Sequence, residues 1–372
     1  MALRILRGEI ASLGLVIALS AFVPAGAHAG STTIAQAAEV ARIIERKWQA
    51  EGLRSDDKQT GQMLAEASRT VTEHLLEHGD DVEALILGAK LEFFALDASP
   101  ALIDVGPGKP PLEEQFRPRA AAIQLAHERL DRAIRLLPDS AEAHFWKSRV
   151  YMLKALVTRD GMTSLVENMD GALREMQLAL QLDPGSERYA MQVVWMLMQY
   201  RQDVSEAARV AKGLRQGTHP LARLLARSLP ELAAIPLPED SMPWPAGLES
   251  ASRFIATPQL PLRTVLRLVP GRIDRVEAFF AKHWSGFVLH EVEPGNTKYR
   301  GQWLHWRDGQ IEPATIEQFR AMKGYPSHGM VMIVFESDQL PADESARTNF
   351  PIPPDRIYCI LMITNMRSAP DP

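Results

Sequence analysis

Apolar residues in the first half of the chain recur at the three- and four-residue spacing of an α-helix. From position 31 to 52 this spacing is kept by Ile34, Ala38, Ala41, Ile44 and Trp48. Ser31, Thr32 or Thr33 can cap the start of this helix. The same spacing predicts a second helix from Asp56 or Asp57 to Gly79 and a third over 81–96. The first half is therefore expected to be helical.

The clearest helical pattern occurs twice. Ala126, Leu130, Ala133 and Pro138 stand at spacings of 4, 3 and 5, and the same spacings separate Ala172, Met176, Ala179 and Pro184. The neighbouring text agrees, with LDRAIRLLPDSAEA in one copy and MQLALQLDPGSERY in the other. An internal repeat of this kind indicates a stack of similar helical units.

These residues resemble the tetratricopeptide repeat, in which two antiparallel helices form each unit. The resemblance covers about 64–216. It implies that Ala126, Ala133, Ala172 and Ala179 let the helices pack closely, and that Pro138 and Pro184 start the turns. Ser148 and Tyr151 match the first helix of the family, whereas His144 and Lys147 depart from it. The resemblance implies an α-solenoid that binds a protein or peptide and scaffolds an assembly.

The repeat is longer than the family's unit. Pro138 and Pro184 are 46 residues apart, against 34 in the tetratricopeptide repeat. We expect the extra residues in a loop over 158–170, and a second irregular insertion over 97–117, which is rich in proline and glycine. Insertions in such arrays often share a binding face. They can equally be tolerated surface loops.

A stripe on the helix that follows Pro138 is the first candidate for partner binding. Lys147, Tyr151 and Lys154 stand at spacings of 4 and 3, so one helical face carries all three. In the alternative reading, Tyr151 packs in the core and both lysines are solvated.

Seven prolines mark 230–261 as an extended linker. Trp244 lies between two of them and is expected to dock against a neighbouring domain. The alternative is that this segment is itself held as a peptide ligand.

In the last third of the chain, the spacing of apolar residues includes the pattern of β-strands as well as that of helices. Strand patterns cover 262–269, 286–292, 298–307, 330–335 and 356–364, and helical patterns cover 272–284 and 315–322. This order predicts an α+β domain over 262–372. The fold class is therefore multidomain, with a helical-hairpin repeat domain over 30–229 followed by a small α+β domain.

The stretch 298–307 has a tryptophan on each face if it is a strand. Trp303, His305 and Arg307 share one face, which predicts an outward docking patch. The alternative is that helices cover both faces of the sheet.

Catalytic motifs are not found. Ser327 beside His328 lacks the glycine spacing of a nucleophile elbow, and His283, His290, His305 and His328 lack the spacing of metal ligands. Cys359 is expected to be a buried thiol and Met191, Met196 and Met198 to be core fillers. The sequence therefore predicts no catalytic residue, no metal and no cofactor.

The N-terminus reads as a signal peptide over 1–29. Arg4 and Arg7 precede an apolar stretch over 10–23, and Ala27-His28-Ala29 is an A-x-A cleavage site. This predicts export to a bacterial periplasm; the alternatives are secretion or an uncleaved membrane anchor. No later segment reaches 18 uncharged apolar residues, so no stable membrane insertion is expected after cleavage.

The net charge and the cysteine content exclude some kinds of partner and some kinds of site. A net charge of −5 argues against nucleic-acid binding, and one cysteine excludes an internal disulfide or a Cys-rich metal site. The sequence therefore favours a periplasmic adaptor or scaffold. The alternatives are an enzyme or small-ligand domain over 262–372 regulated by the array, and self-association through the array.

Overall fold

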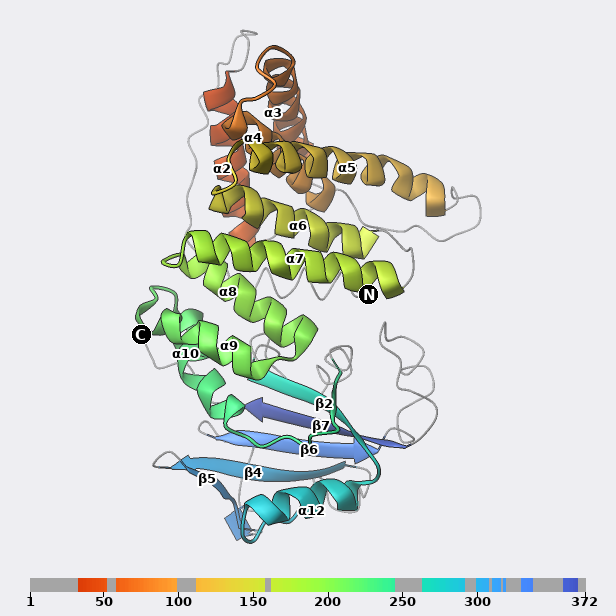
Figure 1. Cartoon of the computed structure of the whole chain (residues 1–372), viewed down its shortest axis with the longest axis vertical. Coiled ribbons are helices and arrows are strands. Elements are labelled where there is room, and N and C mark those ends of the chain that lie inside the picture. The colour runs from red at the N-terminus through yellow and green to blue at the C-terminus, as the bar shows by residue number, and fades with distance from the viewer. Residues whose placement is uncertain are drawn as a thin grey trace. The chain divides into compact units, whose positions relative to one another are not determined.

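A computed structural model gives the fold of the chain (Figure 1). It describes residues 33–51, 58–98, 112–157, 162–244, 263–291, 299–307, 310–315, 317–318, 329–336 and 357–366. The chain forms two compact units, Met1–Gly185 and Ser186–Pro372. The predicted combination of a helical first part and a later antiparallel sheet is confirmed.

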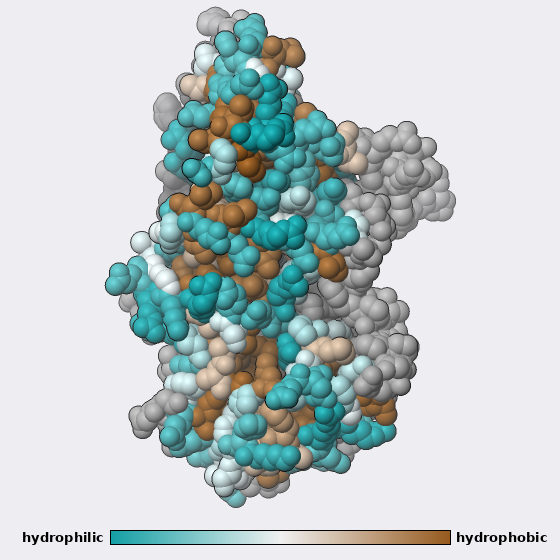
Figure 2. Space-filling model, in the orientation of Figure 1, coloured by the Kyte–Doolittle hydropathy of each residue, from teal (hydrophilic) through white to brown (hydrophobic). Residues whose placement is uncertain are grey.

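The first unit is built from helices that pack on their neighbours in chain order. These are α2 (Ile34–Glu51), α3 (Lys58–Glu77), α4 (Val82–Ala98), α5 (Leu112–Leu136), α6 (Ala141–Val157) and α7 (Met162–Leu182). In Figure 2 their visible surface carries hydrophobic residues as separate patches among hydrophilic ones. The helices of this unit are therefore polar over much of the surface seen in this view.

Side-chain caps start several of these helices. Thr33 Oγ1 accepts the Gln36 N–H at 3.3 Å, and Gln36 Oε1 accepts the Thr33 N–H at 2.7 Å, which together form a capping box. Asp81 caps α4 through the Ala84 N–H, and Ser140 caps α6 through the Ala143 N–H. These caps explain why α2, α4 and α6 begin where they do.

Small and aromatic residues fill the space between the helices. The four predicted packing alanines, Ala126, Ala133, Ala172 and Ala179, are fully buried, while Pro138 and Pro184 are exposed in the turns. Trp146 of α6 is also fully buried, and its ring lies 5.2–5.5 Å from the rings of Phe93, Phe94 and Phe145. Small residues on one helix thus leave room for large ones elsewhere.

Both predicted insertions are shorter than expected. α7 begins at Met162, so most of the expected loop over 158–170 is helix, and α5 begins at Leu112, inside the expected insertion over 97–117. The segment after Met162 contains neither proline nor glycine before Gly171, and its apolar residues keep the helical spacing. The extra residues of the repeat therefore lengthen a helix. Residues 99–111 and 158–161 lie outside the described ranges.

The second unit joins helices to a seven-stranded sheet. Its helices are α8 (Glu187–Met196), η1 (Leu197–Arg201), α9 (Val204–Ala211), η2 (Lys212–Gln216), α10 (Pro220–Ala233) and α12 (Ile273–His283). Its strands are β1 (Met242–Pro243), β2 (Thr264–Pro270), β3 (His290–Glu291), β4 (Tyr299–Arg307), β5 (Gln310–Pro313), β6 (Met330–Glu336) and β7 (Tyr358–Asn365). The order is β1-β2-β7-β6-β4-β3, β5 pairs with β4, and all pairs are antiparallel.

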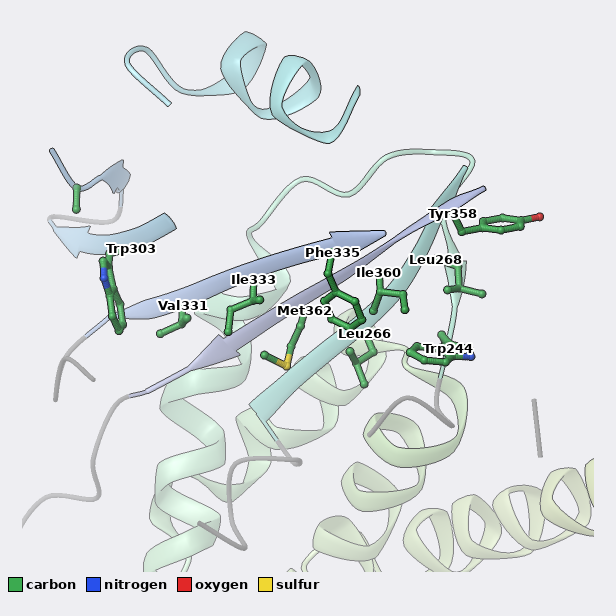
Figure 3. Close-up of a cluster of buried hydrophobic side chains, with 11 residues drawn as sticks. Trp244, Leu266, Leu268, Trp303, Val331, Ile333, Phe335, Tyr358, Ile360 and Met362 are labelled. Atoms are coloured by element: carbon green, nitrogen blue, oxygen red, sulfur yellow. The ribbon is translucent and has the colours of Figure 1, made fainter. Parts of the chain in front are cut away.

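One face of this sheet carries an apolar cluster, which Figure 3 shows pointing away from α12. Its members alternate along β2, β6 and β7, as a period of two requires. On the α10 side, Asn365 of β7 donates from Nδ2 to Ser228 O at 3.1 Å and to Glu231 Oε2 at 3.0 Å. Gln202, in the left-handed region with φ 51°, accepts the Leu266 N–H at 2.7 Å. These hydrogen bonds fix the helices to the sheet.

The expected linker over 230–261 is described only as far as Trp244, and residues 245–261 lie outside the described ranges. α10 continues through Pro230 to Ala233, and β1 pairs with β2. Trp244 is 2% exposed, belongs to the apolar cluster and donates its backbone N–H to Leu266 O at 3.1 Å. The prediction that Trp244 docks onto a folded part of the chain therefore agrees with its position. The division between the two units falls at Gly185, before this segment, because α10 contacts β7, α9 packs on α10 and α8 packs on α9.

Candidate functional site on helix α6

The predicted stripe Lys147, Tyr151 and Lys154, hereafter the α6 stripe, lies on a helix packed between α5 and α7. None of its three side chains is fully exposed. Charged and aromatic groups from both neighbouring helices meet it. The stripe is thus the centre of a polar cluster within one unit.

Lys147 bridges the two neighbouring helices. Its Nζ lies 3.0 Å from Asp131 Oδ1 on α5 and 2.9 Å from Glu175 Oε1 on α7. Burial acts to lower the pKa of Lys147, but the hydrogen bonds to Glu175 and Asp131 outweigh it and raise the pKa above its ordinary value. Lys147 is therefore a fixed charge at neutral pH and not a mobile surface lysine.

Glu175 is shared with a second residue of α6. Its Oε2 lies 2.6 Å from Nδ1 of His144, whose Nε2 lies 3.0 Å from Pro138 O. His144 and Lys147 both contact Glu175 and so link α6 to α7.

His127 of α5 is the most perturbed group of the cluster. Its side chain is buried, and its Nε2 has no hydrogen-bond partner among the described residues. Burial, followed by the positive charges of Lys154 and Lys147, lowers the pKa of His127 to about 4, although Asp131 and Glu175 oppose this. The imidazole is neutral at pH 7 and retains an unused polar atom at the stripe.

The ring of Tyr151 lies in the space left by Gly171 of α7, which has no side chain. Its ring lies 4.6 Å from the His127 ring at 72°. A Cβ on Gly171 of α7 would stand 3.1–3.3 Å from three carbons of that ring. Gly171 therefore lets Tyr151 lie close against α7, and both neighbouring helices fix its orientation. Tyr151 therefore packs between the helices and is still partly exposed.

An equivalent position in the preceding hairpin also holds an ion pair. Arg129 of α5 stands 46 positions before Glu175, which is the distance between the repeated segments. Arg129 lies against Gly88 of α4, where a Cβ would come within 2.8 Å of its Nη1, and it bonds Glu92 at 3.3 Å. Thr72 Oγ1 accepts a second bond from Arg129 at 3.0 Å. Each hairpin thus carries an ion pair between its two helices, with the cation on the second helix in the α4–α5 hairpin and on the first helix in the α6–α7 hairpin.

The predicted docking patch on β4 is not an outward surface at Trp303. This side chain is 8% exposed and packs in the apolar cluster of the sheet. The alternative, with helices on both faces, describes the packing better, since α10 contacts β7 and α12 contacts β6. His305 is partly buried. The backbone of Arg307 pairs with Gln310, and its side chain lies outside the described residues.

The remaining candidates form no site among the described residues. In the ranges that the structure covers, no three histidine, cysteine, aspartate or glutamate side chains form a metal-binding group. Ser327 and His328 lie outside those ranges. Cys359 is buried in β7, and its Sγ donates to Gly271 O at 3.2 Å. Within the described residues, no helix has the length and apolarity to cross a membrane.

Four residues of the cluster were not predicted from the sequence. His127 and Asp131 stand four apart on α5, and Gly171 and Glu175 stand four apart on α7. This spacing places each pair on one helical face. A search for such pairs on the helices flanking a lysine stripe would have found them.

Comparisons with known proteins add no identification: no protein-family model matches the chain, and no curated protein matches it.

Loss of Lys147 should destabilise the first unit. Lys147→Met leaves Asp131 and Glu175 without their shared cation, and the free energy of unfolding should fall by about 2 kcal/mol. This value allows for the solvent exposure of Asp131, whose side chain is 46% exposed. Denaturation in urea measures the change. Lys147→Arg keeps the charge and should lose less than half as much; equal stability of Lys147→Met and the unmodified protein would contradict the assignment.

Proposed function

We propose that this protein is an exported periplasmic adaptor whose helical hairpins act as a tetratricopeptide-like array and bind a protein or peptide at the α6 stripe. The repeated spacing of alanines and prolines supports the array. The A-x-A pattern after a short apolar stretch supports export.

The arrangement around Tyr151 is the observation that carries the proposal. Its ring is partly exposed yet held by His127 on one side and by the glycine of α7 on the other. Lys147 is fixed by two carboxylates. An aromatic ring and charges that are already ordered lose little conformational entropy on binding, which favours recognition.

The hydrogen-bonding capacity of the stripe suits a peptide. Asp131 keeps part of its carboxylate exposed and can accept a backbone N–H. A peptide chain supplies such donors at regular intervals.

Selection from a displayed peptide library tests the proposal. The bait is the chain without residues 1–29, and the counter-bait carries Tyr151→Ala and Lys154→Ala. The expected result is a set of related peptides that bind the bait and bind the counter-bait at least tenfold more weakly. Arg69→Ala, on exposed α3 surface, serves as the matched control and should retain binding. Peptides that bind all three baits equally would overturn the proposal, as would the absence of enriched peptides from a folded bait.

A further inference from the structure

A cavity in the second unit is lined by three arginines. It has a volume of about 380 Å³ and is bounded by Arg215, Arg223, Ala226, Arg227 and Pro230. Arg215 comes from η2, and the other four residues come from α10. The cavity lies outside the α6 stripe, in a different compact unit.

Helical spacing explains why these side chains converge. Arg223, Arg227 and Pro230 are separated by four and three residues, so one face of α10 carries them all. Arg215 joins them because η2 and α10 are held closely. A Cβ on Gly217, in the turn between them, would meet Ala222 Cβ at 3.1 Å. The small residues at this turn thus bring the third arginine to the cavity.

The turn between η2 and α10 is fixed by a carboxylate from α8. Glu187 accepts the backbone N–H groups of Thr218 and His219, both at 2.8 Å, and the Thr218 hydroxyl at 3.0 Å. Burial acts to raise the pKa of Glu187, but these donors together lower it. Glu187 therefore holds the turn that connects η2 and α10, the two elements that line the cavity.

Arg223 is oriented by the same turn. Its Nη1 donates to Gly217 O at 2.9 Å and to Thr218 O at 2.8 Å. Carbonyl oxygens hold the guanidinium in place but do not neutralise its charge. Arg223 is thus a positioned cation before any ligand arrives.

Two of the three arginines of this cavity have no ion-pair partner among the described residues. Arg215 and Arg227 are exposed and form no ion pair in the part of the chain that the structure describes. The segment 207–230 contains five lysines and arginines and no aspartate or glutamate. Like charges four apart on a helix, as at Arg223 and Arg227, repel each other. A bound anion would relieve that repulsion.

We infer that this cavity binds a small organic molecule carrying two or more negative charges, as a phosphate ester or a polycarboxylate does. Guanidinium groups pair with both oxyanions through two parallel hydrogen bonds. The cavity volume lies at the lower end of small-molecule sites, which span about 300–1,000 Å³. Ala226 and Pro230 add an apolar wall against which a carbon skeleton can pack. The site gives the second unit a ligand-binding role beyond the proposed adaptor function.

Calorimetric titration of the chain without residues 1–29 tests the inference in 150 mM sodium chloride. The probes are glucose 6-phosphate, citrate, inorganic phosphate and glucose. Glucose 6-phosphate or citrate should bind with a dissociation constant below 1 mM and at least tenfold more tightly than inorganic phosphate. Glucose should not bind. The tighter of the two organic anions identifies which oxyanion the cavity prefers.

Two exposed arginines provide variants that should still fold. Arg227→Gln should weaken binding at least tenfold, and Arg215→Gln combined with it at least a hundredfold. Arg209→Gln removes the same charge from α9, where Arg209 pairs with Glu206, and should change binding less than twofold. Equal losses in Arg227→Gln and Arg209→Gln, or binding of no organic anion by the folded protein, would overturn the inference.

Discussion

Lowering the pH from 6.5 to 4 should cost the first unit about 2–3 kcal/mol of unfolding free energy through His127 alone. The folded state keeps the pKa of His127 at about 4, mainly by burial. The unfolded chain has the ordinary value near 6.5 and takes up its proton first. Because the folded pKa is depressed, this stability is present above pH 6.5 and is lost as the pH falls towards 4.

Replacing the histidine should remove this contribution. His127→Phe keeps a ring beside Tyr151 and cannot titrate, so its stability relative to the unmodified protein should rise by about 2–3 kcal/mol between pH 6.5 and 4. Urea denaturation at several pH values measures the difference. His127→Gln should show the same trend if the larger ring disturbs packing. Exposed His78 is the matched control; an equal effect of His78→Gln would contradict the assignment.

Trp244→Ala should lower the free energy of unfolding of the second unit by about 3–5 kcal/mol, the usual loss when a large buried aromatic side chain is replaced by alanine. The side chain is 2% exposed and packs with Leu266, Leu268 and Ile360 in the cluster of Figure 3. Its removal leaves a cavity at the junction of β1 and β2. Chemical denaturation followed by tryptophan fluorescence or circular dichroism measures the loss.

Two companion variants make the Trp244 result specific. Trp244→Phe fills most of the space and should lose less than half as much stability. Met242→Ala alters an exposed residue of the same short strand and should lose under 1 kcal/mol. If the Trp244→Ala protein were as stable as the Met242→Ala protein, the side chain of Trp244 would not contribute to the core of the second unit.

Periodicity was sufficient to predict most elements of the fold. The spacing of Ile34, Ala41 and Ile44 predicted α2, and the apolar runs 330–335 and 356–364 predicted β6 and β7. β1 and β5 were not predicted because strands of two and four residues are too short to show a clear alternation of apolar and polar residues. α7 was predicted too short because repeat length had been assigned to a loop. The 46-residue spacing between the two repeated segments shows that residues have been added, but it does not show whether they lengthen a helix or form a loop.

The candidate site was predicted in part for a similar reason. Spacing placed Lys147, Tyr151 and Lys154 on one face, since that depends on a single helix. His127 and Glu175 reach the same place from other helices, and single-helix periodicity does not give the neighbours of a face. Trp303 illustrates the converse: alternation assigned it a face of β4, but only the packed structure shows that its side chain is buried in the apolar cluster of the sheet.

Site-specific photocrosslinking in the native host is the most direct test of binding at the α6 stripe. A benzophenone amino acid replaces Tyr151 or Lys154 in turn, with Arg69 of α3 as the control position, and mass spectrometry identifies the adducts. We expect one recurrent foreign protein from both stripe positions and none from position 69. Only self-adducts, the same adducts from all three positions, or no adduct from folded exported protein would contradict it.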